Sequence, residues 1–379
     1  MPDARPHWST YGGGLIFPDS PAARPGAAWR SVQNWLGSLG LDGCAVRSPV
    51  AGAGLHLHLP DDLTSQWVPG WDTTGLAQRL ALDTAHNPTD LEREIALALL
   101  GGPLPVVFPS VEELMSAVRM RRYIVEAARR TVLAFHPRDS RRPEAYWRHD
   151  EDNGFTLLPG RRLVDALRAA TQPEAGAAPW AFSCSRATEY VMLLGIAQEL
   201  AHSHAPLLER LEQRCARRAI RSAEFQAAFL REHGSVEAPL PLHYYVPGDR
   251  VWFCNPDAPS SDVAGYEGSW LIYLGNGRFG NFWKSDAPYT LAGKCTELFH
   301  WRHAVRAGAR GIAWIDEDEV ARRVRATVSR PEEGRAILAS MMRLRGPQGA
   351  RTAGGCLDAT REAPRWVRPG THDIRFTDT

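Results

Sequence analysis

The chain has 379 residues, of which 44% are hydrophobic and 23% are charged, so it holds enough apolar side chains for a sizeable globular core. Its 44 Lys and Arg residues nearly balance 43 Asp and Glu residues, for a formal net charge of +1. This balance excludes the strong basic field with which proteins hold nucleic acids or acidic membrane surfaces.

The hydropathy and the cysteines favour a cytoplasmic protein. No apolar run approaches the roughly 20 residues that span a bilayer, and the opening MPDARPHWST lacks the basic and then apolar layout of a signal peptide. Six cysteines are spread along the whole chain, which favours reduced thiols over a disulfide framework. We therefore expect a cytoplasmic protein with neither a membrane nor a nucleic-acid partner.

Residues 1–104 are predicted to form an N-terminal extension or a small domain. Alternating apolar and polar residues predict a strand over 55–59. A helix is predicted to begin at Thr89, which has capping-box spacing to Glu92, and to end before Gly101. The Pro-rich sequence GGPLPVVFPS then marks the end of this region.

Residues 105–326 are predicted to form the main domain, which opens with a long helix. Ser110 and Glu113 have capping-box spacing, and apolar residues recur at helical period to about Phe135. A short amphipathic helix is predicted near 161–170, and a further apolar helix begins at Cys184.

Strands follow the helices. Residues 207–233 are charged and predicted to be helical, and the period then changes. Short strands are predicted over 250–254, 269–274 and 278–283, the last two joined by Asn276-Gly277, which is typical of a hairpin turn. Helices packed on a small antiparallel sheet indicate the α+β class.

The helical pattern returns at the C-terminal end. Helices are predicted over 316–326 and 329–345. Residues 327–379 should then form a C-terminal helix and a loosely ordered tail from Pro347, unless Trp366 or Phe376 docks that tail.

Cys184 is the candidate nucleophile. At the start of a helix, unpaired backbone N–H groups and the helix dipole favour the thiolate form of a cysteine. A nucleophile helix followed by antiparallel strands is the order that a papain-like domain requires, because the base comes from the sheet packed on that helix. The alternative is a structural thiol, since free cysteines are commonly buried.

A series of short motifs supports Cys184. They are, in chain order, ELM at 113–115, IVEAA at 124–128, YWR at 146–148, AFSC at 181–184, HYYVPGD at 243–249, FCNP at 253–256 and GSWLIYLG at 268–275. With them, residues from about 108 to 316 resemble the protein-glutamine gamma-glutamyltransferases of bacterial spore coats, which are compact papain-like transglutaminases.

This resemblance implies an acyl transfer. The nucleophile, at the position of Cys184, attacks the side-chain carboxamide of a protein glutamine and releases ammonia. The resulting thioester is resolved by a lysine amine, which gives an isopeptide bond, or by water, which gives deamidation. The resemblance implies a protein or peptide substrate and neither a cofactor nor a metal.

Three positions depart from the family's pattern. Ser183 and Ser269 stand where the family has acidic residues, and Asn281 or Phe282 stands where it has a histidine. General acid–base help is typically worth ~10²–10⁴-fold in rate, so a replacement is expected. Glu267, two residues before Ser269, is the first candidate.

Other replacements are weaker candidates. Glu189 lies five residues after Cys184 and is expected to be a solvated helix residue pointing off the cysteine face. His300 and His303 follow the third strand; with Cys295 and Cys254 they have spacing for zinc, but only one close cluster is present, so no metal is predicted.

Two other functions remain open at this stage. One is a catalytically silent papain-like module that binds a partner, which the loss of three polar groups favours. The other is a protein deamidase or cysteine peptidase of toxin type, in which water is the acceptor.

Overall fold

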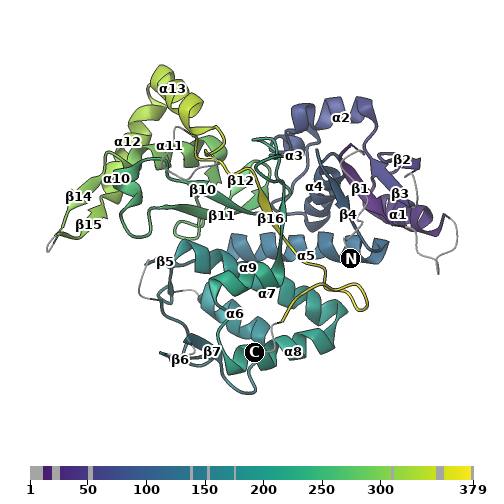
Figure 1. Cartoon of the computed structure of the whole chain (residues 1–379), viewed down its shortest axis with the longest axis horizontal. Helices are drawn as coiled ribbons and strands as arrows, with labels where there is room; N and C mark the ends of the chain where they lie inside the picture. Colours follow the sequence, from purple (N-terminus) through teal and green to yellow (C-terminus); the bar gives the residue numbers. More distant parts are fainter. Residues whose placement is uncertain are drawn as a thin grey trace.

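The computed structural model describes residues 12–18, 26–49, 54–136, 140–151, 154–174, 176–308, 311–346 and 354–376. A six-stranded sheet lies at the centre, with a second sheet and its helices on one side and a group of helices on the other (Figure 1). Helix and sheet occur together throughout, so the protein is of the α+β class. None of the described helices is both long and apolar enough to cross a membrane.

The N-terminal region is built on a four-stranded sheet in the order β2-β3-β1-β4. β1 pairs with β3 in antiparallel and with β4 in parallel orientation. The strands are β1 (Gly14–Phe17), β2 (Val46–Pro49), β3 (Leu55–His58) and β4 (Pro105–Val107). Because β4 follows residue 104, this sheet continues across the boundary predicted there.

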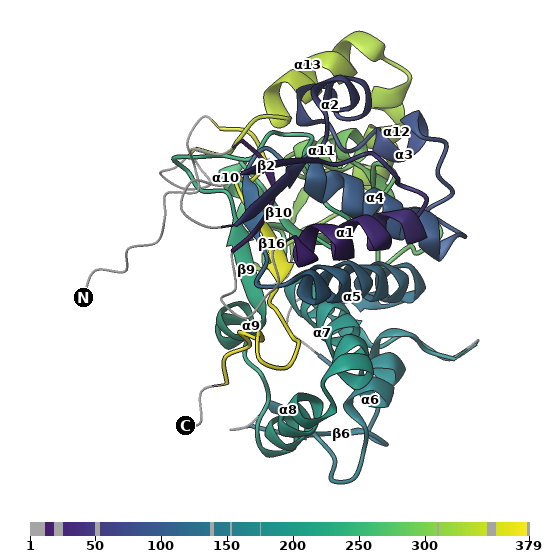
Figure 2. The same cartoon turned by 90° about the vertical axis from the view of Figure 1, so that its right-hand side faces the viewer.

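The helices of this region lie around that sheet; α4 packs against β1, and Figure 2 shows α1 at the front of the region. They are α1 (Ala27–Ser38), α2 (Asp61–Trp67), the 3₁₀ turn η2 (Pro69–Trp71), α3 (Leu76–Arg79) and α4 (Pro88–Leu100). α4 confirms the helix predicted from Thr89, but its cap is Asn87, whose side chain accepts a hydrogen bond from the Thr89 backbone N–H.

Two long helices, α5 (Val111–Arg130) and α7 (Cys184–Ser203), pack against each other beneath the central sheet (Figure 1). Gly195 permits this close approach, because a Cβ there would lie 2.4 Å from Ile124 Cγ1 and 2.7 Å from the Ile124 backbone nitrogen. α5 ends at Arg130 and not at Phe135, since Ala134–Phe135 forms β5, which pairs in parallel with β8 (Ala181–Phe182).

Smaller elements surround α7. They are the hairpin β6 (Trp147–Asp150) and β7 (Gly154–Leu157), with α6 (Leu163–Thr171), α8 (Ala205–Arg217) and α9 (Ser222–Phe229). The single helical stretch predicted over 207–233 is wrong. It breaks into α8, α9 and the strand β9 (Leu230–His233), because the last four residues pair with the C-terminal segment.

The central sheet has the order β13-β12-β11-β10-β16-β9, and all its pairs are antiparallel. Its remaining strands are β10 (Arg250–Cys254), β11 (Gly268–Gly275), β12 (Arg278–Phe279), β13 (Tyr289–Thr290) and β16 (Arg361–Pro364). β10 and β11 confirm two predicted strands. Asn276 and Gly277 both have positive φ, of 50° and 65°, as a two-residue hairpin turn requires.

A second apolar core covers the other side of this sheet. Its elements are α10 (Ala258–Ser261), α11 (Leu291–Trp301), the hairpin β14 (Val305–Ala307) and β15 (Ala313–Ile315), α12 (Glu317–Val328) and α13 (Pro331–Met341). The sequence predicted α12 and α13 but not α11, the helix that reaches closest to the candidate site.

The C-terminal segment is part of the fold. β16 lies between β10 and β9, and Trp366 is buried. The carboxylate of Glu113, which is itself fully buried, accepts hydrogen bonds from the backbone N–H groups of Val367 and Arg368 and from the Thr371 hydroxyl. Residues 354–376 are therefore docked, with Trp366 in the core, which is the alternative that the sequence offered to a loosely ordered tail; Pro347 lies outside the described residues.

Candidate active site

Cys184 is the first residue of α7, and its side chain is partly exposed. Ser183 caps this helix, because its hydroxyl accepts a hydrogen bond from the Arg186 backbone N–H at 3.4 Å. β11 runs against α7, so the sulfur hydrogen-bonds with the backbone amide of Trp270 as well as with that of Ser185. The predicted placement at a helix start beside the sheet is confirmed.

The surroundings of the sulfur act in opposite directions on its pKa. Burial raises the pKa of the Cys184 thiol above its usual value, while the two backbone hydrogen bonds and the positive charges of Lys294 and Arg250 lower it. Burial is the larger effect, so the thiol form dominates near neutral pH.

Lys294 is the first cation near the sulfur. It lies on α11, is only 3% exposed, and its Nζ is 2.6 Å from Glu297 Oε1. The same Nζ lies 4.5 Å from the ring centre of Tyr289 and 5.2 Å from that of Trp301. Burial alone would lower the pKa of Lys294, but Glu297 and Tyr289 raise it above its usual value. Lys294 is therefore a fixed positive charge and not a base.

Arg250 is the second cation. Its guanidinium lies 3.6 Å from the ring centre of Trp270, and it donates hydrogen bonds to the hydroxyls of Thr188 and Ser185 at 2.8 and 3.2 Å. It also forms a 2.5 Å ion pair with Glu362 of β16. The C-terminal strand thus holds the arginine that supports the first turn of α7.

Glu189 corrects the prediction of a solvated helix residue. It is 2% exposed, and its carboxylate accepts hydrogen bonds from the Ser185 hydroxyl at 3.0 Å and from Arg186 Nη1 at 2.8 Å. Its Oε1 also lies 3.9 Å from Nη2 of Arg250, a cation near the sulfur. Arg186 in turn donates to the carbonyl of Ile220.

The other candidates do not form hydrogen bonds with Cys184 within the described part of the chain. Glu267 is exposed in the turn before β11, where its carboxylate accepts from the Gly265 backbone N–H at 3.1 Å. Ser269 is buried on β11, opposite Phe253. Asn281 donates to the Ala287 carbonyl at 3.0 Å and accepts from the Lys284 N–H at 3.2 Å. Its amide therefore holds a loop.

Phe282, the alternative to Asn281 at the position of the family's histidine, lies in the core. The structure thus brings only Cys184 and the strand that carries Ser269 together; it places Glu267 and Asn281 in local turns.

Neither His300 nor His303, the histidines after the third strand, is among the groups that shift the pKa of Cys184. His300 is buried, its Nε2 lies 2.7 Å from the Thr327 hydroxyl, and burial lowers the pKa of His300 to about 4. Cys295 faces Cys356, with the two sulfurs 3.3 Å apart. Among the residues that the structure describes, no group of three or more His, Cys, Asp or Glu side chains is arranged to hold a metal ion.

Comparison with known families gives a match over most of the chain. Residues 73–377, about four fifths of the chain, match the protein-glutamine gamma-glutamyltransferase family. The chain belongs to this family. The match begins within the N-terminal region, well before the residues whose motifs carried the resemblance.

One solved structure is similar to this chain at low sequence identity. A transglutaminase from Geobacillus stearothermophilus, without its C-terminal extension, is similar at 20% sequence identity, over 57% of this chain and 98% of its own, with a TM-score of 0.35. No curated protein matches the sequence.

Sequence reasoning missed the two cations of this family member's site. Lys294 is one of only two lysines in a chain with 42 arginines. This rarity was the one signal in the sequence that could have drawn attention to Lys294. Arg250 directly follows the HYYVPGD motif at the start of a predicted strand. Neither pattern indicates contact with a cysteine more than 60 residues away.

Proposed function

We propose that this member of the glutamyltransferase family transfers the acyl group of a glutamine carboxamide, in a protein or peptide, through a thioester on Cys184. The observation that carries the proposal is the placement of a partly exposed thiol at the N-terminus of α7, against β11, with two backbone amides and two cations around it. This is the helix-on-sheet arrangement of papain-like nucleophiles.

The chemistry runs in two steps. The Cys184 thiolate attacks the carboxamide carbon, the C–N bond breaks, and the nitrogen leaves as ammonia after taking up a proton. A primary amine then attacks the thioester, forms the new amide, and returns the sulfur as thiolate. Water in place of the amine yields a glutamate.

The charges suit the first step. Lys294 and Arg250 favour the thiolate over the thiol, and a buried positive charge also stabilises the oxyanion that forms on the carbonyl oxygen. Ser183, a helix cap, and Ser269 supply no base, so proton removal falls to solvent or to the substrate amine. We expect slow turnover at neutral pH as a result.

The raised pKa of Cys184 also favours a second candidate, a catalytically silent module that binds a partner. A thiol that stays protonated near pH 7 is a poor nucleophile. A cytoplasmic location remains a prediction for either function.

The decisive experiment is incorporation of a labelled primary amine into a glutamine-bearing protein. We expect incorporation with the native chain and none with Cys184→Ala, while Cys44→Ala, which removes a buried thiol of the N-terminal region, serves as the matched control. A mass shift of about one dalton without amine incorporation assigns a deamidase.

The absence of any product, together with inertness of Cys184 to iodoacetamide from pH 7 to 10, assigns the silent module. Product formation that survives Cys184→Ala would overturn the proposed mechanism.

A further inference from the structure

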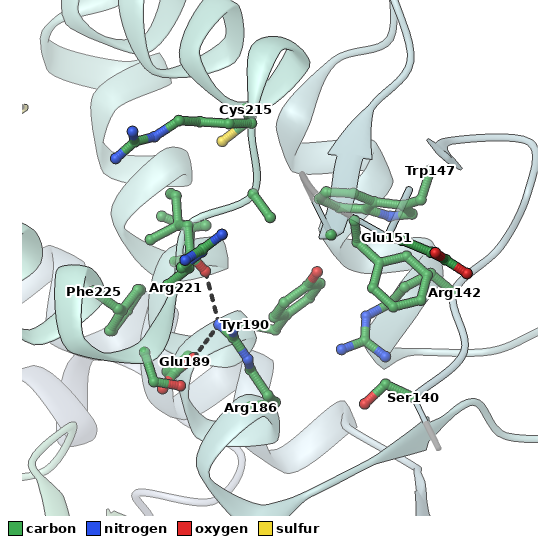
Figure 3. A pocket seen from close by; sticks show the side chains of 17 residues that line it. Ser140, Arg142, Trp147, Glu151, Arg186, Glu189, Tyr190, Cys215, Arg221 and Phe225 are labelled. Carbon is green, nitrogen blue, oxygen red and sulfur yellow. Dashed lines mark hydrogen bonds and ion pairs between the residues drawn. The ribbon is translucent and has the colours of Figure 1, made fainter. Parts of the chain in front are cut away.

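The face of α7 opposite Cys184 borders a cavity of about 510 Å³, which we call the α7 pocket (Figure 3). Four arginines, two glutamates and several aromatic residues line it. Its lining includes Arg142, Trp147, Phe155, Arg186, Tyr190 and Arg221. Its size lies within the range of small-molecule sites, about 300–1,000 Å³.

Arg142 is the most unusual member of this lining. It is 4% exposed, its Nη1 donates to the backbone carbonyls of Arg141 and Ala181 at 2.8 and 3.1 Å, and Tyr190 and Glu189 lie close enough to favour its charge. Its Nε is buried without a hydrogen-bond partner. Among the described residues, no carboxylate forms an ion pair with Arg142. A buried cation with an unsatisfied donor is costly unless an anion joins it.

Aromatic rings frame the same guanidinium. Its Cζ lies 3.3 Å from the ring centre of Phe182, 4.5 Å from that of Tyr190 and 4.9 Å from that of Phe155. Trp147 and Tyr190 approach each other with centroids 5.5 Å apart. Figure 3 shows Arg142, Tyr190 and Trp147 around one hollow. Flat apolar surface therefore adjoins positive charge.

The other arginines extend the positive side. Arg186 is shared between Glu189 and the Ile220 carbonyl, whereas Arg221 is exposed at the N-cap position of α9. Arg218 is paired with Glu224, which lies outside the lining, so three further arginines face two glutamates and the lining keeps a small positive excess.

We infer that the α7 pocket binds a small organic anion in which a flat aromatic ring adjoins a phosphate or carboxylate group. The anionic group pairs with Arg142 and the ring packs against Trp147, Phe155 and Tyr190. Such a site lies apart from the Cys184 face of the helix, so it does not depend on the proposed acyl transfer.

The test is calorimetric titration of the full chain with phenyl phosphate, benzoate, inorganic phosphate and phenol. We expect saturable binding of phenyl phosphate or benzoate, at least about tenfold tighter than that of inorganic phosphate or phenol. Inorganic phosphate lacks the aromatic ring, and phenol lacks the anionic group. The stronger of the two ring anions identifies the charged group.

Variants locate the site. Arg142→Gln should weaken binding about tenfold or more, and Arg186→Gln or Arg221→Gln should weaken it in a chain whose core is untouched. Arg217→Gln is the matched control, since this exposed arginine of α8 lies next to the lining but outside it. Equal binding of phosphate and phenyl phosphate, or unchanged binding in both Arg142→Gln and Arg221→Gln, would overturn the inference.

A separate observation carries a second inference, about Cys295 and Cys356. Both are fully buried, their sulfurs are 3.3 Å apart, and 61 positions separate them in the chain. Cys295 lies on α11, and Cys356 begins the segment that leads into β16. The backbone carbonyl of Cys356 accepts from Cys254, which holds this segment against β10.

We propose that these two thiols form a disulfide when a low-molecular-weight disulfide such as oxidised glutathione is present. When local opening exposes one of the two thiols, it loses its proton to solvent, and the thiolate attacks the glutathione disulfide and releases one glutathione. The second thiolate then attacks the mixed disulfide and releases the other, so two thiols are oxidised and one glutathione disulfide is reduced. The sulfurs need to approach to about 2.05 Å.

The experiment counts thiols in denaturant after incubation with oxidised glutathione at pH 8.5, and maps the peptides by mass. We expect two of the six thiols to be lost and a peptide linked between Cys295 and Cys356, absent in Cys356→Ala. Six remaining thiols after prolonged incubation, or a link between other cysteines, would overturn the proposal.

Discussion

Two ionisable residues near the two ends of α11 have different partners. Lys294, in its second turn, acts on the Cys184 sulfur, whereas His300, in its last turn, bonds to Thr327 of α12. The sequence drew attention to the histidine because histidine is the usual partner of a catalytic cysteine. The structure places the lysine there instead, so residue type is a weaker guide than position on the helix.

The nature of the two environments also differs. Lys294 has Glu297 and two aromatic rings beside it, which keep it charged. Burial, together with the nearby charges of His303, Arg323 and Arg302, holds His300 neutral against the favourable charge of Glu333. A fixed cation and a fixed neutral ring both lack the ability to exchange a proton near pH 7.

Removing the lysine should have the largest effect. Lys294→Met takes away a charge that lowers the pKa of Cys184, so that pKa should rise and the rate of iodoacetamide labelling at pH 8 should fall about tenfold, which corresponds to one pKa unit. Labelling of native and variant chains is followed by mass spectrometry from pH 7 to 10.

His300→Gln is the matched control for that measurement on the same helix. It should leave the labelling profile of Cys184 unchanged. Equal profiles for Lys294→Met and the native chain would show that the lysine has no electrostatic role.

The histidine should show its effect in stability. Its pKa is lowered to about 4 in the folded chain and is ~6.5 in the unfolded chain. The unfolded state therefore binds a proton first, and this contribution to stability is present above about pH 6.5 and is lost as the pH falls towards 4. The free energy of unfolding of the native chain should therefore fall between pH 7 and pH 5. In His300→Gln this fall should be smaller, by on the order of 1 kcal/mol.

Denaturant titrations at the two pH values measure this change, and His86→Gln, at an exposed histidine, serves as the control. An unaltered pH dependence in His300→Gln would contradict the assignment of a buried neutral ring.

The smallest effect is expected for Glu297→Gln, which should raise the rate of Cys184 labelling where Lys294→Met lowers it. Glu297→Gln removes the carboxylate that neutralises Lys294, while the ammonium stays charged at pH 8. Cys184 should then be labelled about two- to threefold faster, because the thiolate experiences a less screened cation. The same labelling assay, with Glu332→Gln on α13 as an exposed control, tests the sign. Slower labelling in Glu297→Gln would show that the ion pair only holds Lys294 in position.

Local elements could be predicted from the sequence because their causes are local. Helical period and a flanking glycine predicted α4, alternation and the Asn276-Gly277 turn predicted β10 and β11, and the start of an apolar run placed Cys184 at a helix N-terminus. The ordered motifs gave the family, and residues 73–377 confirm it.

Only the tertiary structure decided which side chains surround the sulfur. Glu113 has the spacing of a capping box, yet its carboxylate holds a segment more than 250 residues later, and β16 of the C-terminal segment becomes a strand of the central sheet. Lys294 and Arg250 reach Cys184 through α11 and β10, which are far away in the chain. Contacts between distant segments depend on how whole elements pack and bury their charges, and no periodicity or cap within one segment encodes that arrangement.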